Sequence, residues 1–177
     1  VGRDDYRYRL SRYAENGAGE AFWEYDPVGS YDDYAREVLV REDGDILLVG
    51  MAAFSDSDER FGVVRINSAG VFEHEYTYSF GSQDAEFVNS ALPLPDGKFL
   101  LVGRVDGDLA VTRHLASGEL DLLFGTNGIA TVPVLNAADE GCRAVLAPDG
   151  KIVITGFANN GLNQDIVVVR MNQDGSL

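Results

Sequence analysis

Short runs of apolar residues, separated by polar turns that contain glycine, recur along this chain. Three of these runs follow an Asp-Gly turn and close on a second glycine, at residues 46–49, 99–102 and 152–154. The turn glycines are 53 residues apart in both intervals, and so are the closing glycines: Gly44, Gly97 and Gly150, then Gly50, Gly103 and Gly156. A fixed spacing near this length is typical of solenoids and propeller blades. The chain is therefore a repeat protein.

Each repeat divides into four segments, called A to D. Segment A enters the Asp-Gly turn and segment B leaves it, at residues 35–41 and 45–53, 87–94 and 98–105, and 142–147 and 151–157. Segment C lies at residues 8–13, 61–66, 109–114 and 166–171, and segment D at 21–25, 71–80 and 120–134. The turns favour hairpins, because proline presets φ and glycine takes the positive-φ position. The nearly continuous apolar run of segment B is typical of a strand buried on both faces.

Two side-chain types recur at fixed positions. Every C segment carries an arginine near its end: Arg12, Arg65, Arg113 and Arg170. One aligned position of each D segment is aromatic: Trp23, Tyr76 and Phe124. We interpret the aromatic position as a packing slot, and the arginine as a structural residue paired with a carboxylate. The expected acceptors are the turn residues or the acids five positions before the arginine: Asp43, Asp96 and Asp149, or Asp108 and Asp165. The alternative for the arginines is a ring of cationic ligand contacts.

Counting the segments predicts 13 strands in the order C-D, A-B-C-D, A-B-C-D, A-B-C. Four antiparallel strands per unit are typical of a propeller blade. The expected fold is therefore all-β, a partial β-propeller of four-stranded antiparallel blades with about three and a quarter repeats of about 53 residues. The expected units are an incomplete blade at 1–30, blades at 31–83 and 84–135, and an incomplete blade at 136–177. Because propellers close with roughly four to eight blades, we expect the remaining blades of a longer chain, or self-assembly, to close the ring.

The third repeat carries a family resemblance. It reads Leu-Asp-Leu-Leu-Phe-Gly-Thr-Asn-Gly at 120–128, Ala-Pro-Asp-Gly-Lys-Ile-Val-Ile-Thr-Gly at 147–156 and Asp-Ile-Val-Val-Val-Arg-Met-Asn-Gln-Asp-Gly-Ser-Leu at 165–177. These stretches resemble the delta-60 repeat of bacterial β-propeller proteins. The resemblance implies a secreted or cell-surface protein without an established activity. The first repeat departs from the pattern at Glu42, where the other two have proline.

Charge and composition exclude several classes of protein. The net charge is −15, from 14 basic and 29 acidic residues, which disfavours nucleic acid because phosphate binding needs clustered lysine and arginine. No apolar run approaches the roughly 18 residues of a membrane span. The single cysteine, Cys142, cannot form an internal disulfide. Val1 has neither an initiator methionine nor a signal-peptide pattern, so we expect the chain to be trimmed at its start.

Acidic residues recur in two sets of connections. One precedes segment A in each repeat, at intervals of 53: Asp33, Glu86 and Asp139. The B-to-C connections carry others: Asp56, Asp58, Glu59, Asp106, Asp108 and Asp165. Both sets share one face of a propeller, so these acids, with Tyr31 and Tyr34, are candidate ligand-binding residues. Carboxylate oxygens suit Ca²⁺, although no Asp-x-Asp-x-Asp-Gly loop occurs, and the alternative is a solvated acidic rim.

These patterns favour a non-catalytic binding or scaffolding module with a protein or glycan partner. Two alternatives stay open, a lectin-like propeller and a hydrolase or lyase that uses paired carboxylates. The latter needs two carboxyls close together in a cleft, one with a raised pKa. No zinc spacing, nucleotide-binding motif or serine-hydrolase motif occurs, so no catalytic residue is assigned. The Asp-Gly turns lie opposite the acidic loops, and we expect function on the acidic face.

Overall fold

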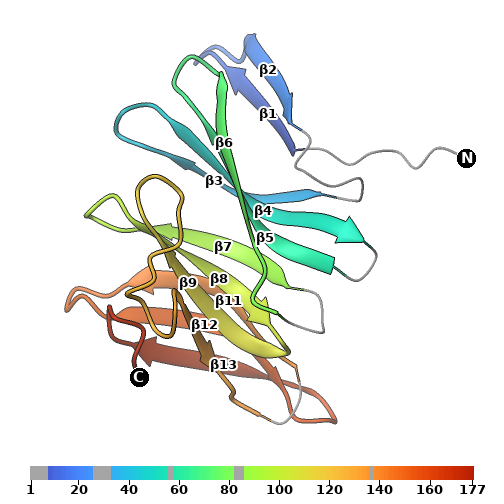
Figure 1. The fold of residues 1–177 in the computed structure, drawn as a ribbon, viewed down its shortest axis with the longest axis vertical. Coiled ribbons are helices and arrows are strands. Elements are labelled where there is room, and N and C mark those ends of the chain that lie inside the picture. The colour runs from blue at the N-terminus through green and yellow to red at the C-terminus, as the bar shows by residue number, and fades with distance from the viewer. Residues whose placement is uncertain (1–7, 26–32, 56–57, 82–85, 136–137) are drawn as a thin grey trace, which may run out of the picture.

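The computed structural model describes residues 8–25, 33–55, 58–81, 86–135 and 138–177. Within these ranges the protein consists of strands without any helix, so no helix there is long and apolar enough to cross a membrane. The strands form four antiparallel sheets, stacked one on another (Figure 1). We call the sheets blades 1 to 4, in chain order. The predicted all-β partial propeller is confirmed.

The strands follow the predicted order of segments. Blade 1 holds β1 (Tyr8–Tyr13) and β2 (Gly19–Tyr25), and blade 2 holds β3 (Tyr34–Val40), β4 (Ile46–Ser55), β5 (Asp58–Ile66) and β6 (Phe72–Tyr78). Blade 3 holds β7 (Phe87–Pro93), β8 (Phe99–Val105), β9 (Asp108–His114) and β10 (Ile129–Val132), and blade 4 holds β11 (Asp139–Leu146), β12 (Ile152–Asn159) and β13 (Gln164–Met171). Within each blade, each strand pairs with the next along the chain. The unit boundaries expected near residues 30, 83 and 135 lie in or beside stretches outside the described ranges, so they stay predictions.

Segment D of the third repeat is shorter than expected. We predicted it over residues 120–134, but its strand, β10, covers only Ile129–Val132. The preceding stretch is a turn in which Gly125, Asn127 and Gly128 have positive φ. Such residues do not fit the extended backbone of a strand. This turn carries Phe124, the third residue of the aromatic slot, into contact with blade 4.

The closing glycines are explained by a bulge. In blades 2, 3 and 4 the register of the first strand shifts opposite the closing glycine; in blade 3 the shift lies between Val88 and Ser90. The bulge presses a backbone carbonyl onto the glycine, so that a Cβ on Gly103 would lie 1.7 Å from the Phe87 oxygen. The corresponding distances at Gly50 and Gly156 are 1.8 and 2.0 Å. Because the atoms that such a Cβ would meet belong to the backbone and cannot turn away as a side chain could, only glycine fits at these positions.

The core lies between the blades rather than within them. Leu47, Val49 and Val63 of blade 2 pack against Phe99 and Leu101 of blade 3, and an equivalent cluster joins blades 3 and 4. A smaller cluster around Tyr8 joins blades 1 and 2. Burial of this apolar area is the main stabilising contribution.

The aromatic slot is also a contact between blades. The rings of Trp23, Tyr76 and Phe124 lie on the turn glycine of the following blade: Gly70, Gly118 and Gly175, respectively. A Cβ on Gly70 would approach the Trp23 ring to 2.1 Å, and one on Gly118 would approach Tyr76 to 2.7 Å. The packing role predicted for this position therefore has a specific partner, which is a glycine in the next repeat.

The first strands of the blades converge along one side of the stack. Arg143 Nη1 of β11 donates a hydrogen bond of 2.8 Å to Glu37 Oε2 of β3, two blades away. Between them, Asn89 Nδ2 of β7 donates to Glu140 Oε1 at 2.6 Å and to the Gly141 oxygen at 3.0 Å. This convergence is the curvature expected of blades arranged around a common axis.

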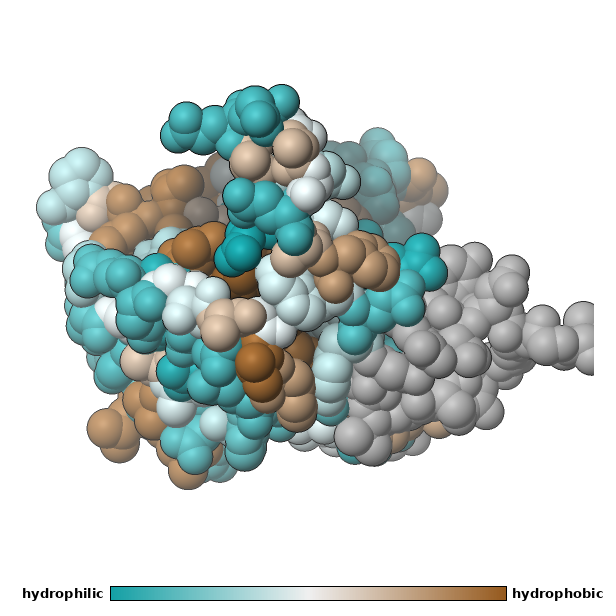
Figure 2. Space-filling model, turned by 90° about the horizontal axis from the view of Figure 1, so that it is seen from above, coloured by the Kyte–Doolittle hydropathy of each residue, from teal (hydrophilic) through white to brown (hydrophobic). Residues whose placement is uncertain are grey.

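The two ends of the stack differ in character. Ile166 and Val168 on the outer face of β13 are 90% and 64% exposed, whereas the matching residues of blade 3, Leu109 and Val111, are fully buried under blade 4. Seen from above, from the blade 1 end, hydrophobic residues lie in separate patches among hydrophilic ones (Figure 2). The outer face of blade 4 is therefore an uncovered blade-packing surface.

Candidate functional site

The two faces of the stack carry different connections. The strand ends that lead into the B-to-C connections lie on the right in Figure 1, and the Asp-Gly turns lie on the left. Connections of adjacent blades touch, since Asp139 N donates to the Gly107 oxygen at 2.7 Å and Glu86 N to the Glu59 oxygen at 3.4 Å. The acidic connections therefore share one face, as the repeat predicts.

The acids that precede segment A are buried on this face. Asp33, Glu86 and Asp139 are 3%, 2% and 0% exposed. Each accepts backbone N–H donors: Asp33 from Ala53 at 2.9 Å, Glu86 from Phe80 at 2.7 Å, and Asp139 from Val134 and Leu135 at 2.7 and 2.9 Å. These three carboxylates are therefore buried and are not part of a solvated rim, while their role in ligand binding stays a prediction. These hydrogen bonds hold the start of segment A in place, because buried backbone N–H groups need acceptors.

The acids of the B-to-C connections lie nearer the surface. Asp58 forms an ion pair of 2.7 Å with Arg60, and Asp165 accepts from Asn160 Nδ2 at 2.9 Å. Asp106 is exposed in a turn with φ of 53°. The Arg36 guanidinium lies 5.8 Å from the centre of the Tyr34 ring. Tyr31 and Asp56 lie outside the described residues.

One group of these acids is close enough to interact. Burial raises the pKa of the Asp108 carboxyl, and the charges of Asp139 and Asp106 raise it further. A raised pKa beside another carboxylate is the feature that the hydrolase alternative requires. Among the described residues no group of three or more histidine, cysteine or acidic side chains could hold a metal ion. Ca²⁺ binding on this face stays a prediction.

The segment-C arginines are paired, but mostly not with the acids we expected. Asp149 does pair with Arg170. The others pair with acids eight residues further along the chain: Arg12 with Glu20 at 3.1 Å, Arg65 with Glu73 at 3.1 Å and Arg113 with Asp121 at 2.8 Å. This spacing is the sequence signal that could have identified them. For Arg12 and Arg65 it works because residues eight apart across the C-to-D hairpin lie on adjacent strands. Asp121 lies in a turn instead, where its N donates to the Arg113 oxygen at 2.8 Å.

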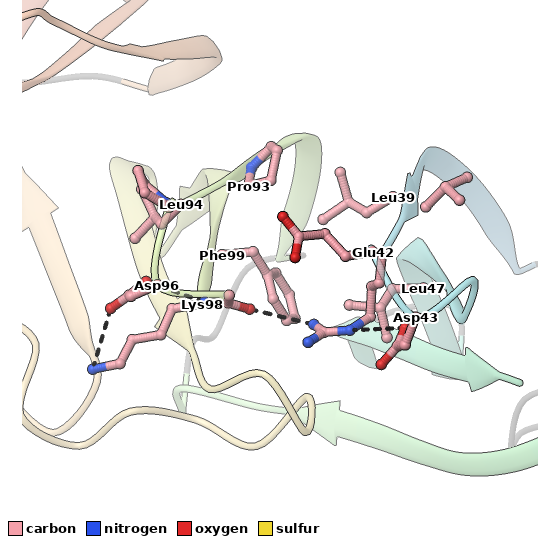
Figure 3. A pocket seen from close by; sticks show the side chains of 13 residues that line it. Leu39, Glu42, Asp43, Leu47, Pro93, Leu94, Asp96, Lys98 and Phe99 are labelled. Carbon is pink, nitrogen blue, oxygen red and sulfur yellow. Dashed lines mark hydrogen bonds and ion pairs between the residues drawn. The ribbon is translucent and has the colours of Figure 1, made fainter.

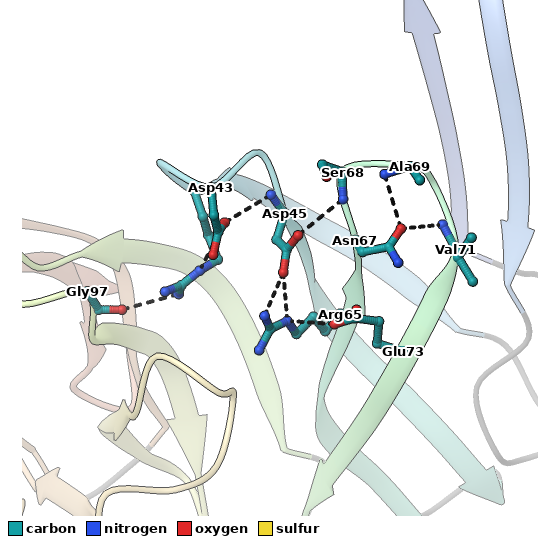
Figure 4. A network of polar contacts seen from close by, with 10 residues as sticks. Asp43, Asp45, Arg65, Asn67, Ser68, Ala69, Val71, Glu73 and Gly97 are labelled. Atoms are coloured by element: carbon teal, nitrogen blue, oxygen red, sulfur yellow. Dashed lines mark hydrogen bonds and ion pairs between the residues drawn. The ribbon is translucent and has the colours of Figure 1, made fainter.

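Asp45 is a second acidic partner of Arg65, beside Glu73 (Figure 4). Arg65 Nη2 and Nε donate to Asp45 Oδ2 at 2.6 and 3.0 Å, and Ser68 N donates to Oδ1 at 3.1 Å. The hydrogen bond from Arg65 holds the pKa of the Asp45 carboxyl below its usual value. Asp45 therefore ties the A-to-B turn of blade 2 to its C-to-D turn.

In blade 3 the same tie uses Asp121. Position 98, which matches Asp45, is a lysine, and Lys98 Nζ donates to Asp121 Oδ2 at 2.9 Å. Arg113 also donates from Nη1 to the Gln173 oxygen of the next blade at 2.6 Å. The arginines thus connect turns and blades, which supports the structural interpretation over a ring of ligand contacts.

A cavity lies on the opposite face, between the Asp-Gly turns of blades 2 and 3 (Figure 3). It measures about 590 Å³, a size within the range of small-molecule sites. Leu39 and Leu47 of blade 2 and Leu94 and Phe99 of blade 3 supply apolar walls, and the charged lining residues are Arg41, Glu42, Asp43, Asp96 and Lys98. We call this cavity the inter-turn pocket. We expected function on the acidic face instead, and that expectation stays a prediction.

The inter-turn pocket exists where the repeat is broken. Arg41 and Glu42 stand where the third and fourth blades have Leu94 and Pro95, then Ala147 and Pro148. Arg41 Nη1 donates to the Gly97 oxygen across the pocket at 3.3 Å, and its Nε lies 3.8 Å from Asp43 Oδ1. The equivalent cavity between blades 3 and 4 measures only about 210 Å³. Charged residues that depart from the repeat therefore line the larger of the two equivalent cavities.

A comparison with known protein families found a match for one part of the chain. Residues 147–177 match the family model described as Domain of unknown function (DUF5122) beta-propeller. This stretch contains the last Asp-Gly turn with β12 and β13. The match agrees with the stacked four-stranded sheets, and the chain carries a β-propeller repeat. No curated protein matches the chain.

Proposed function

We propose that this chain is a non-catalytic binding and scaffolding module, a propeller segment of the delta-60 repeat type from a secreted or cell-surface bacterial protein. The match of residues 147–177 to a β-propeller family model supports the repeat type at its coarser level. The location is the one that the delta-60 resemblance implies. The binding site in this proposal is the inter-turn pocket.

The observation that carries the proposal is the coincidence of a cavity with a break in the repeat. The described residues that recur from blade to blade serve packing, within a blade for the closing glycines and between blades for the aromatic slot. Arg41 and Glu42 do not follow the pattern of their counterparts, and both line the pocket of about 590 Å³. A pocket with apolar walls and a few convergent polar groups is the usual form of a binding site. A purely structural blade junction does not need those charges.

Pocket filling tests the proposal. Leu39→Trp places a large side chain into the cavity from β3, and Val145→Trp adds the same side chain on the outer face of blade 4 as the control. A set of small amphipathic compounds is screened by ligand-observed NMR against the wild-type protein and both variants, with circular dichroism as the check of folding. We expect compounds that bind wild type to lose their signal with Leu39→Trp and keep it with Val145→Trp. Binding that Leu39→Trp leaves unchanged, or no binding to wild type, would contradict the proposal.

A further inference from the structure

The charges in the inter-turn pocket do not balance. Arg41 is engaged by Asp43 and by the Gly97 oxygen. Lys98 Nζ is engaged by Asp121, which lies outside the pocket lining, at 2.9 Å. The same ammonium lies 4.0 Å from Asp96 Oδ2. Three acids and two bases line the pocket, so Glu42 leaves the lining with one excess negative charge, and the whole chain has a net charge of −15.

Glu42 carries the negative charge that faces the cavity. Its carboxylate points into the space between Leu39 and Pro93, over Phe99 (Figure 3). Within the described part of the chain, this carboxylate has no hydrogen bond or ion pair of its own. Glu42 is exposed, with these apolar side chains beside it, so a cation that brings hydrocarbon with it would pair with the carboxylate and cover the apolar walls.

We infer that the inter-turn pocket receives a lysine side chain from a short basic segment of a protein partner, with its ammonium against Glu42 and its alkyl stem on Leu39 and Phe99. This inference rests on the proposed function, whose binding site it specifies. A lysine stem covers apolar surface while its head stays charged. The volume of about 590 Å³ exceeds one lysine side chain, so residues that flank it occupy the rest of the pocket.

The test uses peptides that differ only in the inserted side chain. A fluorescent nonapeptide with a central lysine is compared with its norleucine and glutamate versions by anisotropy, and free 1,5-diaminopentane is tested as a competitor. We expect the lysine peptide to bind roughly tenfold more tightly than the norleucine peptide, as for a hydrogen bond to a charged group. Its affinity should fall between 50 and 300 mM salt, since salt screens an ion pair at the surface.

Two variants remove the anion without opening the turn. Glu42→Gln keeps the shape, and Glu42→Pro restores the residue that Pro95 and Pro148 supply in the sister turns. Position 42 tolerates proline because the Gly44 N to Arg41 oxygen bond of 3.0 Å closes the turn, as the Gly97 N to Leu94 oxygen bond does at 3.1 Å. Both variants should weaken the lysine peptide roughly tenfold. Asp165→Asn, an equal loss of charge on the other face, should leave its affinity unchanged.

The outcomes separate this inference from the proposed function. If the norleucine or glutamate peptide binds as well as the lysine peptide and Leu39→Trp abolishes that binding, the pocket is a binding site but the inference is wrong. Displacement by diaminopentane at the same concentration as the lysine peptide would also overturn it, because the alkylammonium ion rather than a protein segment would then be the ligand. If no peptide binds in a way that Leu39→Trp affects, and the compound screen is also negative, both proposals fail.

Discussion

Replacing Asp121 by asparagine removes the anion that Lys98 and Arg113 share. Asp121 Oδ2 accepts from Lys98 Nζ at 2.9 Å and from Arg113 Nε at 2.8 Å, and Oδ1 accepts from Leu123 N at 3.2 Å. The side chain of Asp121 is 5% exposed and that of Arg113 is 13% exposed. These hydrogen bonds hold the pKa of the Asp121 carboxyl below its usual value, with the bond from Lys98 as the largest cause.

The expected cost follows from burial. Breaking a buried ion pair by removing one partner costs roughly 3–5 kcal/mol, because the other charge stays buried without compensation. Lys98 is 30% exposed and can regain water, and Arg113 keeps its bond to the Gln173 oxygen. We therefore expect Asp121→Asn to lower the free energy of unfolding by about 3 kcal/mol, which corresponds to a fall in Tm of roughly 6–12 °C for a chain of this length.

Urea unfolding at pH 7, followed by circular dichroism, measures this loss. The midpoint should fall while the slope m stays the same, because the surface exposed on unfolding does not change. Asp149→Asn is the matched control, since Asp149 pairs with Arg170 at the corresponding arginine of blade 4 but the two side chains are 50% and 53% exposed. The control should shift the midpoint by no more than the experimental error, as is usual for surface pairs.

The reasoning would be refuted by either of two results. If both variants lose the same stability, burial does not decide the strength of these pairs. If Asp121→Asn is as stable as wild type, the pairing of Arg113 with Asp121 does not stabilise blade 3, and the structural interpretation of the arginines loses its main support.

Three further predictions concern other parts of the fold. Burial lowers the pKa of His114 to about 4, so the imidazole stays neutral in the native state, whereas in the unfolded chain it takes up a proton below about pH 6.5. The free energy of unfolding should therefore fall by about 3 kcal/mol as the pH drops from 6.5 to 4. Parallel pH profiles of the urea midpoint for wild type and His114→Gln would contradict this. Gly103→Ala, which drives a Cβ to within 1.7 Å of the Phe87 oxygen, should cost about 3 kcal/mol in urea unfolding, whereas Gly19→Ala, with 3.9 Å to its nearest neighbour, should change little. The uncovered face at Ile166 should make the chain self-associate, and Ile166→Lys should lower the weight-average mass in sedimentation; equal masses at every concentration would count against this.

Much of the fold could be predicted because its causes are local. An Asp-Gly turn, an apolar run and an alternating strand each depend on residues close together in sequence, and their 53-residue spacing exposes them. The exception is segment D of the third repeat, where glycine and asparagine with positive φ replace most of the strand by a turn. The bounds predicted for this segment were therefore wrong before Ile129, where β10 begins.

The candidate site could not be predicted in the same way. Asp33, Glu86 and Asp139 were identified by their spacing, but their burial and the backbone N–H groups that they accept depend on how the chain folds around them. The acids that pair with Arg12, Arg65 and Arg113 follow a regular spacing of eight residues, and only the hairpin register makes that spacing meaningful.

The period, the strands, their order within a blade and the residues that recur between blades could all be predicted from the amino-acid order. The contact of the aromatic slot with the next blade, the burial of the recurrent acids and the pocket at Arg41 and Glu42 became visible only in the folded chain. The physical reason is that repeats encode what each unit shares, whereas a pocket arises where two units meet and fail to match. Glu42 was visible in the sequence as a departure from proline, but its unpaired charge became evident only once blade 3 was placed against it.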